Sequence, residues 1–180
     1  MNPKKFALWI GIVSMSMTFA ALTSAYIVRR GESNWLIFDL PNVFYVSTII
    51  IILSSLTMHW AVNAAKNDNI TQLKSAISIT TLLGIGFTFS QLMGWSALVE
   101  NKIFFAGVQS NPAGSFVYVL TLLHMAHIAG GIIVLLISLF KSFTFKIHSK
   151  NMGTIQLTAT YWHFVDILWL YLFVFLLINR

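Results

Sequence analysis

The chain has 180 residues, of which 57% are hydrophobic and only 9% are charged. A soluble domain carries about 25% charged residues, and a core in so short a chain could not enclose this much apolar surface, so an ordinary soluble domain is excluded. A net charge of +6 in a soluble protein would suggest nucleic acid, but here the basic residues lie between apolar runs, where they orient helices. We therefore expect no nucleic-acid partner. The absence of cysteine excludes disulfides and thiolate metal sites.

Five apolar runs are long enough to cross a bilayer, which takes about 20 residues. They predict helices at about residues 6–28, 40–62, 75–98, 115–140 and 154–178. Pro41 and Pro112 fall where a helix would begin, a position that proline tolerates. A period-two pattern is absent, which argues against an outer-membrane barrel. We expect an all-α integral membrane protein, a bundle of five transmembrane helices that forms a single transmembrane domain over residues 1–180.

The basic residues predict how the helices are oriented, because the inner side of a membrane protein carries more lysine and arginine. With the N-terminus inside, the inner side carries seven basic residues and the outer side four. The inner ones are Lys4, Lys5, Lys66, Lys74, Lys141, Lys146 and Lys150, and the outer ones are Arg29, Arg30, Lys102 and Arg180. This bias predicts an N-terminus inside and a C-terminus outside, with the pair of arginines as a local exception.

Five polar residues inside the apolar runs are candidate functional residues, since an ionisable side chain at mid-membrane costs about 2.5–3.5 kcal/mol. They are His124 and His127 in the fourth run, His163 and Asp166 in the fifth, and Gln91 in the third. Each pair is three residues apart and therefore shares one helical face. We expect these side chains to form one buried polar cluster.

His127 and Asp166 are predicted to meet within that cluster. His127 is 12 residues from the outer start of its run at Ser115, and Asp166 is 12 residues from the outer end of its run at Ile178. Because every helical residue adds the same rise, the two side chains should lie at one depth. We expect a contact between the imidazole and the carboxylate.

Three roles are open for the cluster. Two histidines could hold a b-type haem. However, His124 and His163 would be offset by roughly 9 Å at 1.5 Å per residue, and pairing His127 with His163 would leave Asp166 unexplained. The cluster could relay protons, or it could lock the helices together, which is the interpretation that the sequence favours. No nucleophile–base pair, P-loop or zinc motif is present, so we predict no catalytic residue and no metal site.

Two segments resemble the cytochrome c oxidase subunit III family. Residues 161–173, YWHFVDILWLYLF, closely resemble the motif of its final helix, and residues 121–131 are similar to its TGxHxxHxxxG helix. Weaker similarity covers residues 53–61 and 84–91, and residues 14–26 fit loosely, so the matches follow the family's order. The resemblance implies that five motif residues pack between helices: Tyr161, Trp162, Trp169, Gly130 and Gly131.

This resemblance implies a short five-helix bacterial form that lacks the first two helices of the seven-helix form. Such a subunit is not an enzyme by itself and binds neither haem nor copper, which are expected in partner subunits. It would stabilise subunit I, which reduces oxygen to water and pumps protons, and contact subunit II in a bacterial cytoplasmic membrane. It would also support proton uptake and hold phospholipid. Residues 23–30 and 94–98 are similar to variants found with alternative complex III supercomplexes.

The chain also departs from the family pattern. The family usually has a buried glutamate where Met15 follows Ser14, and losing it makes the contact to Asp166 more necessary. His59, His148 and the inner lysines could collect protons, although solvated charges are the simpler interpretation. The alternative functions are a small b-type cytochrome that anchors electron transfer in the membrane, and a proton-coupled transporter.

Overall fold

The computed structural model describes residues 3–144, 147 and 151–179. These residues form five helices: α1 (Pro3–Arg30), α2 (Val43–Lys66), α3 (Ile70–Glu100), α4 (Pro112–Phe143) and α5 (Gly153–Asn179). Each is long and apolar enough to cross a membrane. The predicted all-α, five-helix architecture is confirmed. The helices extend beyond the apolar runs because their polar ends continue past the bilayer core, except that α2 begins at Val43, just after Pro41 instead of including it.

Asparagine side chains cap two of these helices. Asn69 accepts a hydrogen bond from the backbone N–H of Gln72 at the start of α3. Asn111 does the same for Ala113 at the start of α4, where Pro112 occupies the first turn. Asparagine suits this position because its side-chain oxygen satisfies a backbone N–H that has no partner within the helix.

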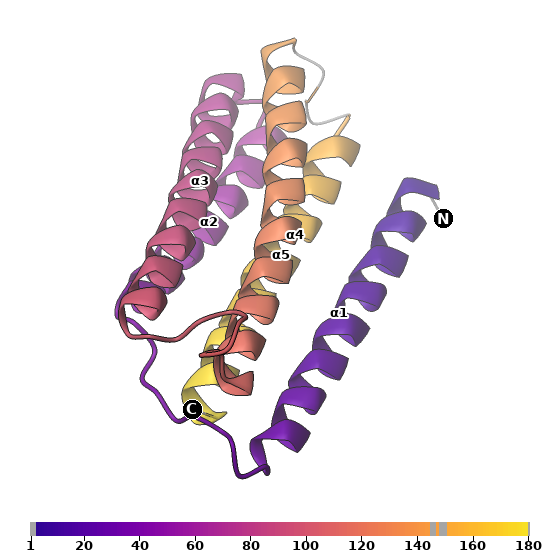
Figure 1. The fold of residues 1–180 in the computed structure, drawn as a ribbon. Coiled ribbons are helices and arrows are strands. Elements are labelled where there is room, and N and C mark those ends of the chain that lie inside the picture. Colours follow the sequence, from indigo (N-terminus) through magenta and orange to yellow (C-terminus); the bar gives the residue numbers. More distant parts are fainter. Residues whose placement is uncertain (1–2, 145–146, 148–150, 180) are drawn as a thin grey trace.

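Helices α2 to α5 close into a ring, whereas α1 lies outside it (Figure 1). Within the ring α2 packs on α3 and α5, and α4 packs on the same two helices from the other side. Among the described residues, α1 contacts only α4 and α5. Its buried residues are Ile12, Phe19, Thr23 and Tyr26, a single stripe at spacings of seven, four and three. Most of the surface of α1 therefore faces lipid or another protein.

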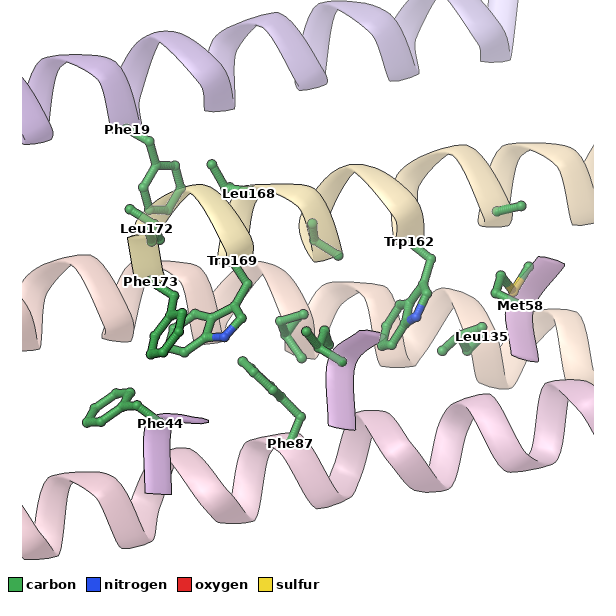
Figure 2. Packing of buried hydrophobic residues seen from close by; sticks show 14 of the residues in the cluster. Phe19, Phe44, Met58, Phe87, Leu135, Trp162, Leu168, Trp169, Leu172 and Phe173 are labelled. Carbon is green, nitrogen blue, oxygen red and sulfur yellow. The ribbon is translucent and has the colours of Figure 1, made fainter. Parts of the chain in front are cut away.

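Aromatic and hydroxyl contacts hold α1 in place. Phe19 points at α5 beside Leu168 and Leu172 (Figure 2). One turn further, the hydroxyls of Thr23 and Tyr171 are hydrogen-bonded at 2.8 Å. The ring of Tyr26 makes edge contacts with Trp35, Phe116 and Phe175. All of these contacts lie in the second half of α1, whereas its first half buries Ile12 and lines a pocket with α2 and α5.

The segment between α1 and α2 is fastened to α4 by Asn111. The same side-chain oxygen that caps α4 accepts a hydrogen bond from the N–H of Leu36, and the amide nitrogen donates to the carbonyl of Asn34 at 2.6 Å. One asparagine thus joins the first connection to the start of α4. These bonds fix the end of the bundle that lies opposite the N-terminus.

Trp162 of α5 fills the centre of the ring, and two glycines make room for its indole. A Cβ atom at Gly131 of α4 would lie 2.9 Å from Cζ3 of Trp162, and one at Gly84 of α3 would lie 2.7 Å from Cη2. Gly130, the neighbour of Gly131, is different: its Cβ would meet Oη of Tyr161 at 3.6 Å, an ordinary contact. The close helix approach therefore depends on Gly131 and not on Gly130.

We predict that Gly131→Ala destabilises the protein by about 1–3 kcal/mol, because the added methyl group collides with a fully buried indole that has no space to move. Gly130→Ala is the matched control and should leave stability nearly unchanged. The measurement is the fraction of protein that stays monodisperse in detergent after heating, followed by size-exclusion chromatography. Equal melting temperatures for the two variants would contradict the assignment.

Candidate functional site

Hydroxyl groups join each neighbouring pair of helices in the ring. Thr57 and Thr80 bond α2 to α3 at 2.8 Å, and Ser138 and Thr158 bond α4 to α5 at 2.7 Å. Between α3 and α4, the indole N–H of Trp95 donates to the hydroxyl of Thr121. A polar group in lipid has no water to bond with, so such pairs can form only where two helices face each other.

The two tryptophans of the final helix hydrogen-bond to hydroxyls of α2. The N–H of Trp162 donates to Oγ of Ser54 at 2.9 Å, and that of Trp169 donates to Oγ1 of Thr48 at 3.0 Å. Both indoles are fully buried. Figure 2 shows the ring of Trp169 beside those of Phe44 and Phe87. These bonds align α5 with α2 along the face that carries both tryptophans.

His163 lies between the tryptophans and also faces α2. Its Nδ1 and the hydroxyl of Ser55 are 2.7 Å apart, within hydrogen-bond distance. Ser55 approaches Asp166, one turn along α5, as well. Asp166 is only 3% exposed, and neither of its carboxyl oxygens has a hydrogen-bond partner with standard geometry among the described residues. Ser55 therefore lies between a histidine and a buried, unpaired acid.

The two histidines of α4 have different surroundings. His124 is completely buried, and the rings of Phe19, Phe87 and Trp169 lie 5.3–6.4 Å from its ring, centroid to centroid. Within the described part of the chain neither ring nitrogen of His124 has a hydrogen-bond partner. The environment of His124 is a packed aromatic core.

His127 faces α1. Its Nδ1 is 2.7 Å from the carbonyl oxygen of Leu123, its ring lies 5.8 Å from that of Phe19, and its own carbonyl accepts the hydroxyl proton of Tyr161. The predicted contact between His127 and Asp166 is not formed. Equal depth in the membrane does not imply the same direction around the helix axis: His127 turns toward α1, whereas Asp166 turns toward Ser55 of α2.

The remaining polar residue of the expected cluster, Gln91, also pairs with α2. Its Nε2 donates to Oγ of Ser47 at 2.9 Å, and its Oε1 has no partner among the described residues. The five candidates are thus spread over different interfaces. His163 and Asp166 share Ser55, His124 and His127 flank Phe19, and Gln91 bonds to Ser47.

His163 also lines a pocket of about 410 Å³ at the end of the bundle that carries the N-terminus. Its polar walls come from the start of α1, the end of α2 and the start of α5, and comprise Lys5, His59, Lys66, Gln156, Thr160 and His163. His148, the other residue expected to collect protons, lies outside the described residues. Residues 3–144, 147 and 151–179 contain no group of three or more His, Cys, Asp or Glu side chains that could hold a metal ion.

The hydroxyls of α2 were not among the expected site residues. Thr48 and Ser54, which accept the indole N–H groups, are six residues apart, and Trp162 and Trp169 are seven apart, so both sets span about two helical turns. Similar spacings on two apolar helices could have indicated that these faces meet. Serine and threonine are common in membrane helices, however, and many bond only to their own backbone.

Comparison with known proteins gives a family model and individual relatives that carry the same description, the third subunit of an oxidase. The family model described as "Cytochrome c oxidase subunit III" matches residues 36–179, which include α2 to α5. The probable cytochrome c oxidase subunit 3 of Rickettsia bellii is 31% identical over 162 residues, 87% of this chain and 56% of that protein. The cytochrome c oxidase subunit 3 of Corynebacterium diphtheriae is 30% identical over 166 residues, 88% of this chain and 79% of that protein.

A subunit of a quinol oxidase is similar as well. The cytochrome bo(3) ubiquinol oxidase subunit 3 of Buchnera aphidicola subsp. Baizongia pistaciae is 28% identical over 172 residues, 93% of this chain and 87% of that protein. The chain therefore spans little more than half of the rickettsial relative but most of the other two. Similarity extends over all of the helices that form the ring.

We predict that His124→Phe leaves stability unchanged or raises it, within about 1 kcal/mol, because it removes two buried nitrogens that have no partner and keeps the aromatic packing. His163→Phe is the matched comparison and should lower stability by about 1 kcal/mol, since Ser55 loses its hydrogen bond. Thermal unfolding of both variants in detergent measures the difference. A large loss for His124→Phe would mean that the imidazole has a polar partner.

Proposed function

Because this chain belongs to the cytochrome c oxidase subunit III family, we propose that it is the non-catalytic third subunit of a haem–copper terminal oxidase. The observation that carries the proposal is the family match over residues 36–179. It includes the final helix, where the motif residues Trp162, Asp166 and Trp169 all face the inside of the bundle. The chain is accordingly a multi-pass membrane protein that works within an oxidase complex.

The partners are the other oxidase subunits, with subunit I as the principal one and subunit II beside it. In this proposal subunit I reduces oxygen to water, and the partner subunits carry the haem and copper. The names of the relatives support the assembly, since each is a numbered subunit of an oxidase. The exposed apolar side chains of α1, among them Trp9, Val13 and Met17, offer a surface for a partner subunit or for phospholipid. Membership of an alternative complex III supercomplex rests on the similarity of residues 23–30 and 94–98.

The chain lies in a bacterial cytoplasmic membrane with its N-terminus inside, and it supports proton uptake from that side. Lysines at the N-terminal end of the bundle support this orientation: Lys4, Lys5, Lys66, Lys74 and Lys141 lie at helix ends that point the same way. The pocket that contains His59 and His163 opens at the same end. High coverage of bacterial relatives, 79% of the corynebacterial protein for example, supports the short bacterial form.

The two alternative functions are less well supported. A b-type cytochrome would need two histidines facing one haem, but His124 is enclosed by aromatic rings, His127 faces Phe19 of α1, and His163 faces Ser55 of α2. A proton-coupled transporter finds no support in the relatives named above, which are all oxidase subunits.

The test is purification of the tagged chain from its native membrane in mild detergent. We expect oxidase subunits to purify with it, and the complex to show the absorption of haem together with bound copper. The control is the same chain produced without the partner subunits, which should purify without a haem spectrum. A haem spectrum from the chain alone would overturn the proposal in favour of a cytochrome, and purification from native membranes without any haem-containing protein would also overturn it.

A further inference from the structure

The N-terminal pocket continues as a line of polar groups into the middle of the bundle. On α5, Gln156, Thr160 and His163 line the pocket at spacings of four and three residues, which places them on one helical face. The next position along that face is Asp166, about 4.5 Å deeper at 1.5 Å per residue. Since α5 spans Gly153–Asn179, Asp166 is its midpoint.

Ser55 of α2 connects the pocket to this acid. Its hydroxyl is 2.7 Å from Nδ1 of His163 and also approaches the carboxyl of Asp166. His163 lines the pocket and is therefore open to water from the pocket. Its Nδ1 contacts the hydroxyl of Ser55. The groups that face His163 are His59 of α2 and, across the pocket, Lys5 of α1 and Lys66 of α2. Lys5, His59, Lys66 and His163 can all carry a proton, and the one acid near the histidine among the described residues is Asp166 itself.

Asp166 is the only acidic residue of the sequence that falls inside the predicted apolar runs; the other four are Glu32, Asp39, Asp68 and Glu100. Its carboxyl group has neither an ion pair nor a standard hydrogen bond with a described residue. A bare carboxylate in such a place is far more costly than a neutral carboxylic acid, which needs only ordinary hydrogen bonds. A buried acid that stays neutral must obtain its proton by some route.

We propose that Asp166 is a protonated carboxylic acid that exchanges its proton with water in the N-terminal pocket through Ser55 and His163. This inference deepens the proposed function, because a subunit that supports proton uptake needs a group that can hold a proton and a way to reach it. The pocket volume of about 410 Å³ exceeds the roughly 30 Å³ that one water molecule occupies in the liquid. Water can therefore reach His163.

Each transfer conserves protons and breaks no bond between heavy atoms. A hydronium ion in the pocket gives a proton to Nε2 of His163 and becomes water, while Nδ1 releases its proton to the Ser55 hydroxyl and Ser55 passes its own proton to the carboxylate. The reverse sequence returns the proton to the pocket. Ser55 and His163 act as positioning and relay groups, and Asp166 holds the proton.

Infrared spectroscopy tests this relay in the purified chain with any oxidase subunits that accompany it, reconstituted in lipid nanodiscs. A protonated carboxyl group has a C=O stretching band that shifts to lower frequency when deuterium replaces its proton. We expect the wild type to show such a band, Asp166→Asn to lack it, and transfer into deuterated buffer to shift it. Ser55→Ala and His163→Phe should slow the shift by roughly tenfold or more, because each removes one step of the route.

Two further variants separate a relay from a structural effect. Ser55→Thr keeps the hydroxyl and should keep the fast exchange. Ser54→Ala removes the neighbouring hydroxyl, which bonds to Trp162 instead of His163, and should leave the exchange rate unchanged even though it lowers stability.

The proposal is overturned if the Asp166→Asn spectrum equals that of the wild type, if the band fails to shift in deuterated buffer, or if Ser55→Ala exchanges as fast as Ser54→Ala. Failure of the oxidase subunits to purify with the chain would overturn the proposed function and leave this measurement intact. If the C=O band does not belong to Asp166, the proton relay is overturned and the proposed function is unaffected.

Discussion

Polar groups buried among lipid-facing helices bond either to their own backbone or to a neighbouring helix, and in this protein the partners across helices are mostly hydroxyls. The indole N–H groups of Trp162 and Trp169 donate to Ser54 and Thr48. The amide of Gln91 donates to Ser47, and the indole of Trp95 donates to Thr121. Each bond is modest in membrane proteins, typically about 0.6–2 kcal/mol. Together they set the rotation of each helix about its axis, which apolar contacts with lipid cannot do.

The hydrogen bonds between the tryptophans of α5 and the hydroxyls of α2 also determine where other residues of α5 lie. Because two indoles of α5 bond to α2, the face between them also turns to α2, and His163 and Asp166 arrive beside Ser55. Gly84 and Gly131 allow the indole of Trp162 to fill the space between α3 and α4. The family motif on this helix is therefore largely a packing element, and its two ionisable residues are placed by the tryptophans on either side of them.

The sequence predicted the helices well and the contacts less well, for one physical reason. Apolar length is a property of a single segment, so five membrane-spanning helices and a helix start at Pro112 follow from the chain itself. Depth also follows from counting residues, but direction around the helix depends on which neighbour each face meets. Counting placed His127 level with Asp166, yet the two point at different helices. Ser55 was missed because nothing in its local sequence distinguishes it from a serine that bonds to its own backbone.

Helix α1 packs on the bundle through one stripe of buried residues, Ile12, Phe19, Thr23 and Tyr26. Side-chain hydrogen bonds join helices α2 to α5 into a ring, whereas α1 adds one stripe of contacts to the outside of α4 and α5. Biogenesis can thus proceed in two stages, with ring closure first and docking of α1 afterwards. Among the five described helices α1 buries the smallest share of its residues, so it is the helix with the most surface left for a neighbouring protein.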